Sequence, residues 1–412
     1  MRVCVVGSGG REHALAHVLR RTSDVVVTPG NPGIPGAVAT PPEEIDADLF
    51  VVGPEAPLVD GLADRLRAEG RLVFGPGADG ARLEGSKAWM KDLIAAAGVP
   101  TARYGSFIDE PAALGFLRSL GGPWVVKTDG LAAGKGVLVT DSLDEAVGDV
   151  RAKLAGDSFG EAGRTVVIEE GMTGPELSVL AVCDGARAVP LAPAQDFKRV
   201  GDGDTGPNTG GMGAYSPVPF AGPDVVGTVM DRFVEPTLAE LRRRGIDYRG
   251  VLYAGLMLTP EGPKLLEYNV RFGDPEAQVV LPRLTTDLAE LLAAAARGDL
   301  RRAPAPAFGA DACVTVVLAS EGYPASPRTG DVIGGIEAAE ALGVTVFAAG
   351  VGRDREGRLV TAGGRVLAVT GVGATVAAAR DHAYAAAGCI SWPGMHHRTD
   401  IALHSSQEAA ST

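Results

Sequence analysis

At 412 residues the chain is long enough for two to four domains, and its many Ala, Val and Leu with few aromatic residues are typical of α/β enzymes. Its 38 basic and 51 acidic residues give a net charge of −13, which argues against a general surface for nucleic acid or anionic membranes. No apolar run approaches the ~20 residues that span a bilayer, the N-terminal run is too short for a signal peptide, and four widely spaced cysteines predict reduced thiols in a cytoplasmic protein.

A strand, a glycine turn and a helix open the chain. An apolar run at residues 3–6 predicts a buried strand, the turn Gly7-Ser8-Gly9-Gly10 follows at once, and residues 11–20 carry a helical apolar face. A dinucleotide fingerprint would need glycine where Glu12 stands, and an acidic residue after the strand at residues 25–27, where none occurs. A nicotinamide dehydrogenase is therefore disfavoured. The helix N-terminus is expected to bind a phosphorylated sugar, with a purely structural turn as the alternative.

Two more strands are expected at residues 49–52 and 72–74, and the first of them ends in Gly53-Pro54-Glu55. Strands that alternate with helices form a parallel sheet, whose ligand loops lie at the carboxyl ends of the strands. The first hundred residues therefore predict an open parallel α/β domain.

A helix is expected to run from the N-cap Ser86 through Ala97, because apolar residues recur on one face and glycine and proline follow. Lys87 and Lys91 lie one turn apart on this helix. Solvent-exposed surface is the usual explanation for lysines in such positions.

A loop rich in glycine and lysine lies between apolar runs at residues 124–126 and 137–139, which predicts a strand, a phosphate-covering loop and a second strand. Lys127 ends the first strand. The loop residues of interest are Gly130, Gly134, Lys135 and Gly136. Glycines leave backbone N–H groups free to bind phosphate oxygens, and lysines add positive charge. The glycine spacing and the missing Ser or Thr exclude a Walker A motif, so metal ligands must come from elsewhere; an ordinary hairpin loop is the alternative.

The strand expected at residues 165–170 ends in two glutamates, Glu169 and Glu170, and another strand begins at Glu176. Adjacent residues of a strand point to opposite faces, so only one of the two glutamates is expected to face a ligand.

The segment over residues 195–213 is rich in glycine and polar residues, among them Asp196, Asn208 and Thr209. It cannot form a core, yet it is too long for a simple turn. Long loops without regular structure inside compact domains are usually functional, and a disordered linker is the alternative.

A β-hairpin is expected from strands at residues 252–259 and 264–272. Alternation along the second strand places Glu267, Asn269 and Arg271 on one face, with same-face neighbours ~7 Å apart. A carboxylate and an amide oxygen at this spacing suit Mg²⁺ or Mn²⁺ held together with nucleotide phosphates. A solvated polar strand face is the alternative.

A third block of strands and helices follows an Ala- and Pro-rich linker at residues 301–308. Its strands are expected at residues 313–318, 344–348 and 364–370 and its helix at residues 374–387, with few candidate catalytic groups. The tail after Asp400 is small and polar and is expected to be disordered.

Taken together, five motifs in order resemble the glycinamide ribonucleotide synthetase family of the ATP-grasp superfamily over nearly the whole chain. They are GSGGREHAL at Gly7, LEGSK at Leu83, KTDGLAAGKG at Lys127, DGDTGPNTGGMGAYSP at Asp202 and NVRFGDPE at Asn269. The resemblance implies an N-terminal α/β substrate-binding domain over residues 1–100 and an ATP-grasp domain over 101–303 with a glycine-rich lid at about 121–190. A small C-terminal α+β domain over 304–400 and a tail over 401–412 complete the implied division.

The implied reaction joins glycine to 5-phosphoribosylamine in purine synthesis, with ATP converted to ADP and phosphate. Glycine attacks the γ-phosphate to give glycyl phosphate, which the amine then attacks. Lysines and Mg²⁺ or Mn²⁺ would neutralise the phosphates, and the lid would exclude water from the acyl phosphate. No nucleic acid or membrane partner is expected. The protein is expected to be a monomer.

The resemblance also implies roles for single residues. Those implied to bind ATP are Lys87, Lys127, Gly134, Lys135, Gly136, Glu169, Glu170 and Glu176. Those implied to bind the other substrates are Gly9, Gly10, Pro54, Glu55, Asp196, Asn208, Thr209, Arg271 and Gly273. The implied metal ligands are Glu267 and Asn269, and the implied catalytic groups are Arg271, Lys127 and Asn208.

Three positions depart from the family's pattern: Phe197 and Ala348 stand where the family commonly has His, and Thr128 stands where it has Ala. The phosphate, metal and lid motifs are intact, so the activity is still expected. The alternatives are another ATP-grasp carboxylate–amine ligase and a nucleotide-binding protein without turnover, which would be expected to lose Glu267 and Asn269 first.

Overall fold

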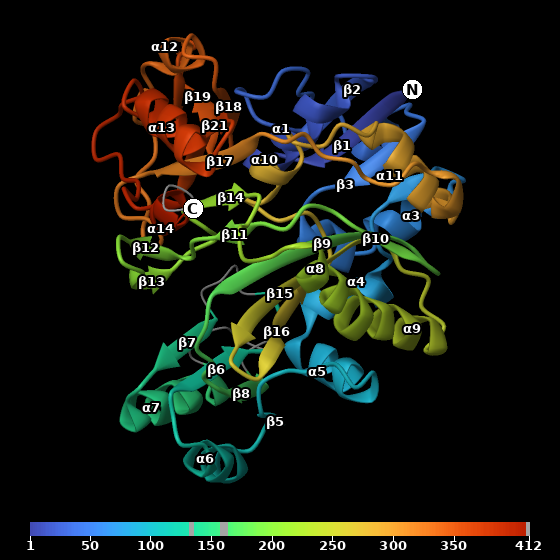
Figure 1. Cartoon of the computed structure of the whole chain (residues 1–412), viewed down its shortest axis with the longest axis vertical. Helices are drawn as coiled ribbons and strands as arrows, with labels where there is room; N and C mark the ends of the chain where they lie inside the picture. Colours follow the sequence, from blue (N-terminus) through green and yellow to red (C-terminus); the bar gives the residue numbers. More distant parts are fainter. Residues whose placement is uncertain (132–135, 157–163, 409–412) are drawn as a thin grey trace.

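The computed structural model describes residues 1–131, 136–156 and 164–408. Figure 1 shows the N-terminal and C-terminal parts of the chain at one end of the molecule and the segment that carries β5 to β8 at the other. A four-stranded sheet lies between them. In the described ranges, no helix has the length and apolar character to cross a bilayer.

The N-terminal part is built on a parallel sheet of order β2-β1-β3-β4, as the strand–helix alternation predicts. Its strands are β1 (Arg2–Gly7), β2 (Asp24–Pro29), β3 (Leu49–Val52) and β4 (Val73–Phe74). The helices are α1 (Gly10–Leu19), α2 (Glu55–Val59), α3 (Leu62–Ala68), α4 (Ala78–Gly85) and α5 (Lys87–Ala96). Every residue of β3 is buried, as expected for a continuous apolar run in a parallel sheet. The side chain of Ser86 caps α5 by accepting the Trp89 N–H at 3.1 Å.

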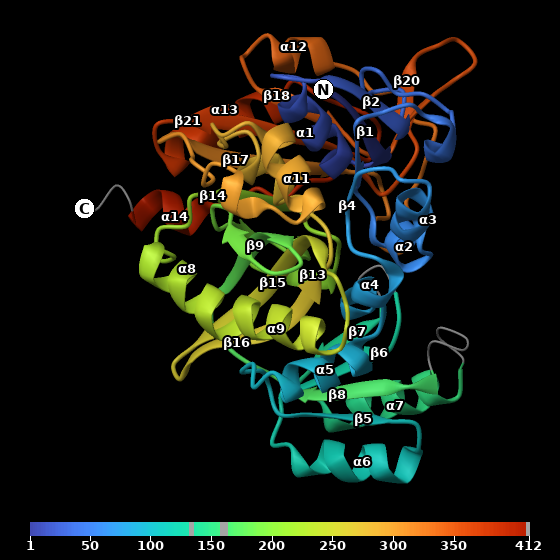
Figure 2. The same ribbon diagram turned by 90° about the vertical axis from the view of Figure 1, so that its right-hand side faces the viewer.

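An antiparallel sheet of order β5-β8-β6-β7 forms a subdomain that contains the loop predicted to act as a lid, and we call this β5–β8 unit the lid subdomain. Its strands are β5 (Tyr104–Phe107), β6 (Trp124–Thr128), β7 (Val137–Thr140) and β8 (Val166–Glu170), and its helices are α6 (Glu110–Ser119) and α7 (Leu143–Leu154). Both helices cover one face of this sheet (Figure 2). Their apolar residues, among them Leu117 and Val150, form a core separate from that of the rest of the molecule. The lid subdomain is therefore a unit with its own packing, joined to the body at its edges.

The central sheet has the order β10-β9-β15-β16, with all neighbours antiparallel. Its strands are β9 (Glu176–Asp184), β10 (Ala188–Pro190), β15 (Arg249–Thr259) and β16 (Gly262–Asn269). Helix α8 (Pro223–Val229) continues through the π-helical segment Met230–Val234 into α9 (Glu235–Arg243), and α10 (Ala277–Val280) and α11 (Leu288–Arg297) follow the sheet. The expected hairpin is present, but β16 ends at Asn269 rather than at position 272. The Val270 N–H donates to Glu84 Oε2 at 2.9 Å, so it leaves the strand ladder there.

The C-terminal part holds a five-stranded sheet of order β11-β14-β17-β21-β18. Its strands are β11 (Gln195–Asp196), β14 (Gly213–Ser216), β17 (Ala312–Ala319), β18 (Thr345–Ala348) and β21 (Arg365–Gly373). Helix α13 (Val376–Ala387) packs on β17 and β21, and α12 (Ile336–Glu340), β19 (Val351–Arg353) and β20 (Leu359–Thr361) lie beside them. Two strands from the middle of the chain thus join the C-terminal sheet, which crosses the boundary expected near residue 304.

The expectation of an irregular loop over residues 195–213 is wrong in part. Strands β12 (Arg199–Gly201) and β13 (Thr205–Asn208) pair as a short hairpin. Residues far along the chain hold it: Arg398 Nη1 lies 2.7 Å from Asp204 Oδ1, and the Thr399 N–H donates to Asp202 Oδ1 at 2.8 Å. The hairpin depends on partners about 200 positions away, which local composition does not reveal.

The expected disorder after residue 400 is also wrong for most of that tail. Helix α14 (Leu403–Glu408) is present, and Ile401 is fully buried before it. The Ser405 hydroxyl donates to the Tyr215 hydroxyl at 2.6 Å, which ties the helix to β14. Residues 409–412 lie outside the described residues.

The N-terminal and C-terminal parts meet where α1 packs against β18. The His13 ring lies edge-on to Phe347, with 5.5 Å between ring centroids, and its Nδ1 accepts the Ala348 N–H at 2.9 Å. Burial, with smaller contributions from His17 and Arg20, lowers the pKa of His13 to about 4. The neutral ring is therefore the form that the folded protein holds.

We expect this interface to weaken in acid. The unfolded chain binds a proton at His13 below a pKa of ~6.5, whereas the folded chain does so only below about 4. The contribution of neutral His13 to the unfolding free energy is therefore fully present above pH ~6.5 and is lost as the pH falls towards 4. Between pH 7 and pH 5 the wild type should lose roughly 2 kcal/mol more unfolding free energy than His13→Gln, whose amide oxygen can still accept the Ala348 N–H. Urea unfolding of both proteins at both pH values measures this, and equal losses would contradict it.

Candidate active site

One cavity of about 520 Å³ lies where the body, the lid subdomain and the C-terminal part meet. Its polar lining residues are Arg11, Glu55, Glu84, Lys87, Asp196, Lys198, Thr209, Tyr253, Glu267, Tyr268, Asn269, Arg271, Asp274, Glu276, Tyr323 and Arg365. Leu131 and Gly136, the described residues on either side of the lid loop, also line it. Five arginines and lysines against six carboxylic acids make this wall strongly charged.

The end of β16 supplies the residues expected to share one strand face. Glu267, Asn269 and Arg271 all line the cavity. Asn269 is 9% exposed, and its Oδ1 accepts from Arg271 Nη2 at 3.1 Å. The structure therefore brings together an anionic oxygen, an amide oxygen and a guanidinium, although Arg271 lies just beyond the end of the strand.

The carboxyl group of Glu267 is surrounded by cations. Burial raises its pKa, but the charges of Lys198, Lys127 and Lys87 lower it more, so the pKa lies below its usual range. Lys87, at the first turn of α5, donates from Nζ to the Gly130 carbonyl at 2.9 Å, and burial lowers its pKa. An ionised carboxylate faced by lysines from three separate segments of the chain can hold a cation and anionic groups beside it.

Lys127 and Glu169 lie behind this wall in a buried ion pair. Lys127 Nζ is 2.8 Å from Glu169 Oε1 and donates to the Leu266 carbonyl at 3.3 Å, next to Glu267. Lys91 Nζ lies 2.9 Å from the other oxygen of Glu169. The expectation that Lys91 is solvated is wrong, because its side chain is fully buried in this pair.

The two neighbouring glutamates at the end of β8 point in different directions, as strand alternation requires. Glu169 is 2% exposed, whereas Glu170 is partly exposed and its Oε1 accepts the Arg103 N–H at 2.9 Å. Glu176, at the start of β9, pairs with Lys198, whose Nζ is also 3.9 Å from Asp196 Oδ1. Burial raises the pKa of Asp196 to about 8 even though Lys198 lowers it.

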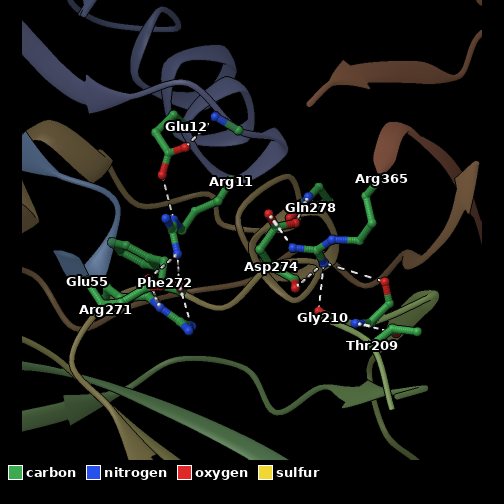
Figure 3. Close-up of polar contacts among 12 residues, drawn as sticks. Arg11, Glu12, Glu55, Thr209, Gly210, Arg271, Phe272, Asp274, Gln278 and Arg365 are labelled. Carbon is green, nitrogen blue, oxygen red and sulfur yellow. Dashed lines mark hydrogen bonds and ion pairs between the residues drawn. The ribbon is translucent and has the colours of Figure 1, made fainter. Parts of the chain in front are cut away.

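The first glycine turn holds the side chain of Glu12 in the space beside it (Figure 3). Its Oε2 accepts the Gly9 N–H at 2.6 Å, and its Oε1 accepts from Arg11 Nε at 2.5 Å. A Cβ on Gly7 or Gly53 would overlap Glu12, so both glycines are required by this carboxylate. The same carboxylate stands where a dinucleotide fingerprint has glycine, and it orients Arg11 into the cavity.

Arg271 is held between two carboxylates from the N-terminal part, as Figure 3 shows for Glu55. Its Nε donates to Glu55 Oε2 at 3.2 Å, and its Nη2 donates to Glu84 Oε1 at 2.8 Å. Burial raises the pKa of Glu55, but Arg271 and Arg11 lower it more, so that carboxyl group titrates below its usual range.

On the opposite side of the cavity, Arg365 of β21 joins two loops (Figure 3). Its Nη1 donates to the carbonyls of Gly210 and Asp274, each at 2.7 Å, and its Nη2 donates to Asp274 Oδ2 at 3.1 Å. Thr209 lines the cavity beside Gly210, and its hydroxyl donates to the Lys198 carbonyl at 2.8 Å.

Nine of the expected site residues do not themselves line the cavity. They are Gly9, Gly10, Pro54, Lys127, Glu169, Glu170, Glu176, Asn208 and Gly273. Gly134 and Lys135 lie outside the described residues. Sequence reasoning missed Arg11, Glu84, Lys198, Asp274, Glu276 and Arg365, of which all but Lys198 and Arg365 lie in motifs that carried the resemblance or next to them.

The three residues that depart from the family's pattern are not among the described residues that line the cavity. Phe197 packs its ring against the guanidinium of Arg398, with 5.1 Å between that group and the ring centroid. Ala348 donates its N–H to His13. Thr128 is fully buried, and its hydroxyl has no hydrogen-bond partner among the described residues. None of the three substitutions changes a residue that lines the cavity.

Comparison with known proteins gives consistent matches along the chain. Three family models match: the N domain of phosphoribosylglycinamide synthetase over residues 1–84, its ATP-grasp domain over 85–277 and its C domain over 313–404. The phosphoribosylamine–glycine ligases of Mesorhizobium japonicum and Streptomyces coelicolor are each 49% identical to this chain. The first match covers 97% of both chains, and the second covers 98% of this chain and 99% of the relative.

Solved structures agree. The crystal structure of the phosphoribosylamine–glycine ligase of Thermotoga maritima has a TM-score of 0.85 at 36% identity, covering 97% of this chain and 100% of the other. The N5-carboxyaminoimidazole ribonucleotide synthetase of the same organism has a TM-score of 0.63 at 16% identity, covering 95% of this chain and 99% of the other, and shows the shared fold alone. The expected ATP-grasp fold is thereby confirmed. The chain belongs to the phosphoribosylglycinamide synthetase family.

Proposed function

We propose that this chain is an ATP-dependent ligase that joins glycine to 5-phosphoribosylamine and forms ADP and phosphate, a step of purine synthesis. The names of relatives 49% identical over nearly the whole chain support this reaction. The observation that carries it is that one and the same cavity is lined by the end of β16, by Arg11 beside the glycine turn and by Arg365 of the C-terminal part. One site can therefore bring a nucleotide, an amino acid and a sugar phosphate together.

The residues at the end of β16 fit a divalent metal ion. Glu267 supplies an ionised carboxylate and Asn269 an amide oxygen, both in the cavity wall. Mg²⁺ and Mn²⁺ prefer such oxygen ligands, and Mg²⁺ commonly uses one or two protein groups together with phosphate oxygens. The bound ion would neutralise phosphate charge where the two anionic reactants meet.

The chain's own groups account for the remaining needs of the reaction. Lys87 and Lys127 would bind ATP phosphates, and Arg271 would orient the glycine carboxylate towards the γ-phosphate. The amine of phosphoribosylamine would then attack the carbonyl carbon of glycyl phosphate and expel phosphate. The lid loop, with Gly134, Lys135 and Gly136, would exclude water from that acyl phosphate.

The remaining expected residues receive roles in the same proposal. At the adenine and ribose we place Glu169, Glu170 and Glu176. Around phosphoribosylamine we place Gly9, Gly10, Pro54, Glu55, Asp196, Asn208, Thr209 and Gly273, of which Glu55, Asp196 and Thr209 line the cavity. We further infer a monomer that works in the cytoplasm.

The decisive experiment measures ADP release by the purified protein with Mg²⁺, ATP and glycine, with and without freshly generated phosphoribosylamine. We expect ADP only when both substrates are present, together with formation of glycinamide ribonucleotide. ADP formed with a different amine or acid in place of these substrates would instead support another ATP-grasp carboxylate–amine ligase. No ADP from folded, ATP-binding protein would contradict the proposed reaction.

A further inference from the structure

Lys91 is a buried cation that the proposed reaction does not use. Its side chain on α5 is fully buried, and its ammonium lies 2.9 Å from Glu169 Oε2 and 2.8 Å from Thr101 Oγ1. The Tyr104 ring centroid lies 5.0 Å from the same nitrogen. An ammonium group has three N–H donors, and these three neighbours surround it, so Lys91 has little capacity left for a ligand.

Lys127 differs from Lys91 in where it can reach. It pairs with the other oxygen of Glu169 and donates to the Leu266 carbonyl, the residue next to Glu267 in the cavity wall. These two described contacts leave one of its three N–H donors available. A single carboxylate therefore holds two lysines: Lys91, whose ammonium has no described contact with the cavity wall, and Lys127, which contacts the residue next to Glu267 of that wall.

The three charged groups come from two separately packed units. Lys127 and Glu169 stand on β6 and β8 of the lid subdomain, and Lys91 stands on α5 of the body. A buried carboxylate paired with a single lysine would neutralise the charge of that lysine completely. With two lysines the group carries a net charge of +1, so one positive charge remains for an anion.

We propose that Lys91 is a positioning residue for the nucleotide: it compensates the charge of Glu169, so that Lys127 can be held by this carboxylate and still donate to an ATP phosphate. The proposal rests on the ATP site of the proposed function. Burial raises the pKa of Glu169, but Lys127 and Lys91 lower it more, in keeping with an ionised carboxylate between two ammonium groups. Without Lys91, Glu169 would either draw Lys127 away from the phosphate or take up a proton. A protonated Glu169 would no longer hold Lys127 in place.

The test is direct binding of ATP with Mg²⁺ to the full chain, by calorimetry, in the absence of glycine and phosphoribosylamine. Lys91→Met keeps most of the apolar stem and removes the charge. We expect its Kd for ATP to rise about tenfold or more, because a charge-assisted contact of Lys127 is weakened. The matched control is Lys153→Met, since Lys153 is also a buried helical lysine that pairs with a nearby carboxylate, Asp149, but does not line the cavity. Its Kd should stay within about twofold of the wild type.

A double-mutant comparison separates charge compensation from packing. If Lys91 acts through Glu169, adding Lys91→Met to Glu169→Gln should change the Kd by less than about twofold. This pair of proteins also tests the proposal should Lys91→Met alone fail to fold, because Glu169→Gln removes the uncompensated carboxylate. Equal effects of Lys91→Met in both backgrounds, or a wild-type Kd in the single variant, would overturn the proposal.

Failure of the ligase reaction gives a different result. A wild type that binds ATP but does not join glycine to phosphoribosylamine would contradict the proposed function and leave the binding comparison intact. A wild type that ligates, with an unchanged Kd in Lys91→Met, would overturn only the role of Lys91. No binding of ATP by the folded wild type would overturn both.

Discussion

Replacing Glu267 by Gln should reduce ATP turnover at least about 100-fold without unfolding the protein. The change removes one negative charge from a wall that Lys198, Lys127 and Lys87 face, and it replaces a hard anionic oxygen by a neutral one. Divalent metal ions bind amide oxygens more weakly than carboxylates, so the phosphates would lose both their metal and their alignment. Shape and volume at position 267 hardly change, so the packing of β16 should persist.

ADP release with saturating glycine and phosphoribosylamine measures the effect, and the thermal unfolding midpoint reports the fold. Glu261→Gln is the matched control, because Glu261 belongs to the turn of the same hairpin and its side chain is 72% exposed. The control should keep wild-type turnover. Near-normal turnover in Glu267→Gln would remove Glu267 from the metal site, and a large drop in the unfolding midpoint would assign it a structural role instead.

Features set by residues close in sequence could be predicted from the sequence. The buried run of β3 and the N-cap of α5 follow from local apolar spacing and a single serine. Glu267 and Asn269 could be placed together because alternation along one strand is a property of that strand alone. The glycine turn after β1 could likewise be recognised, because Gly7-Ser8-Gly9-Gly10 directly follows a short apolar run.

Features that depend on distant partners could not be predicted in the same way. A lysine on a helix is usually solvated, and Lys91 is buried only because Glu169, 78 positions later, meets it. Arg365 reaches the cavity only through the five-stranded sheet, which brings β21 beside loops from the middle of the chain. The β12–β13 hairpin likewise needs Arg398 to neutralise Asp204. Tertiary contacts decide these cases, and a single sequence carries no direct signal for them.

The strongest effect on stability is expected from Arg271→Met. The guanidinium lies between Glu55 and Glu84, and both carboxylates are largely shielded from water, with side-chain exposures of 29% and 11%. Removal of one partner from a buried ionic cluster typically destabilises a protein by roughly 3–5 kcal/mol, because the remaining charges stay buried without compensation. The loop after β16 would also lose the contact that fixes Asn269. Turnover should therefore fall together with stability.

The loss of unfolding free energy in Arg271→Met should depend on pH. In the wild type, burial raises the pKa of Glu84 even though Arg271 lowers it; without Arg271 the pKa values of both Glu84 and Glu55 should rise. A carboxyl group whose pKa is raised in the folded state destabilises that state, and the penalty is complete at pH values above the raised pKa. The penalty shrinks as the pH falls and disappears near the pKa of ~4.3 that the group has in the unfolded chain. The variant should consequently be closest to wild-type stability in mild acid and furthest from it at pH 7 to 8.

Urea unfolding at pH 7.5 and pH 5.5, followed by tryptophan fluorescence and circular dichroism, tests both statements. Arg358→Met is the matched control, since Arg358 is 53% exposed and its ion pairs are solvated, and its effect should stay within about 0.5 kcal/mol. Adding Glu84→Gln to Arg271→Met should restore part of the lost stability at pH 7.5 and flatten the pH dependence. A loss below about 1 kcal/mol, or the same loss at both pH values, would show that Glu55 and Glu84 do not need Arg271 for charge compensation.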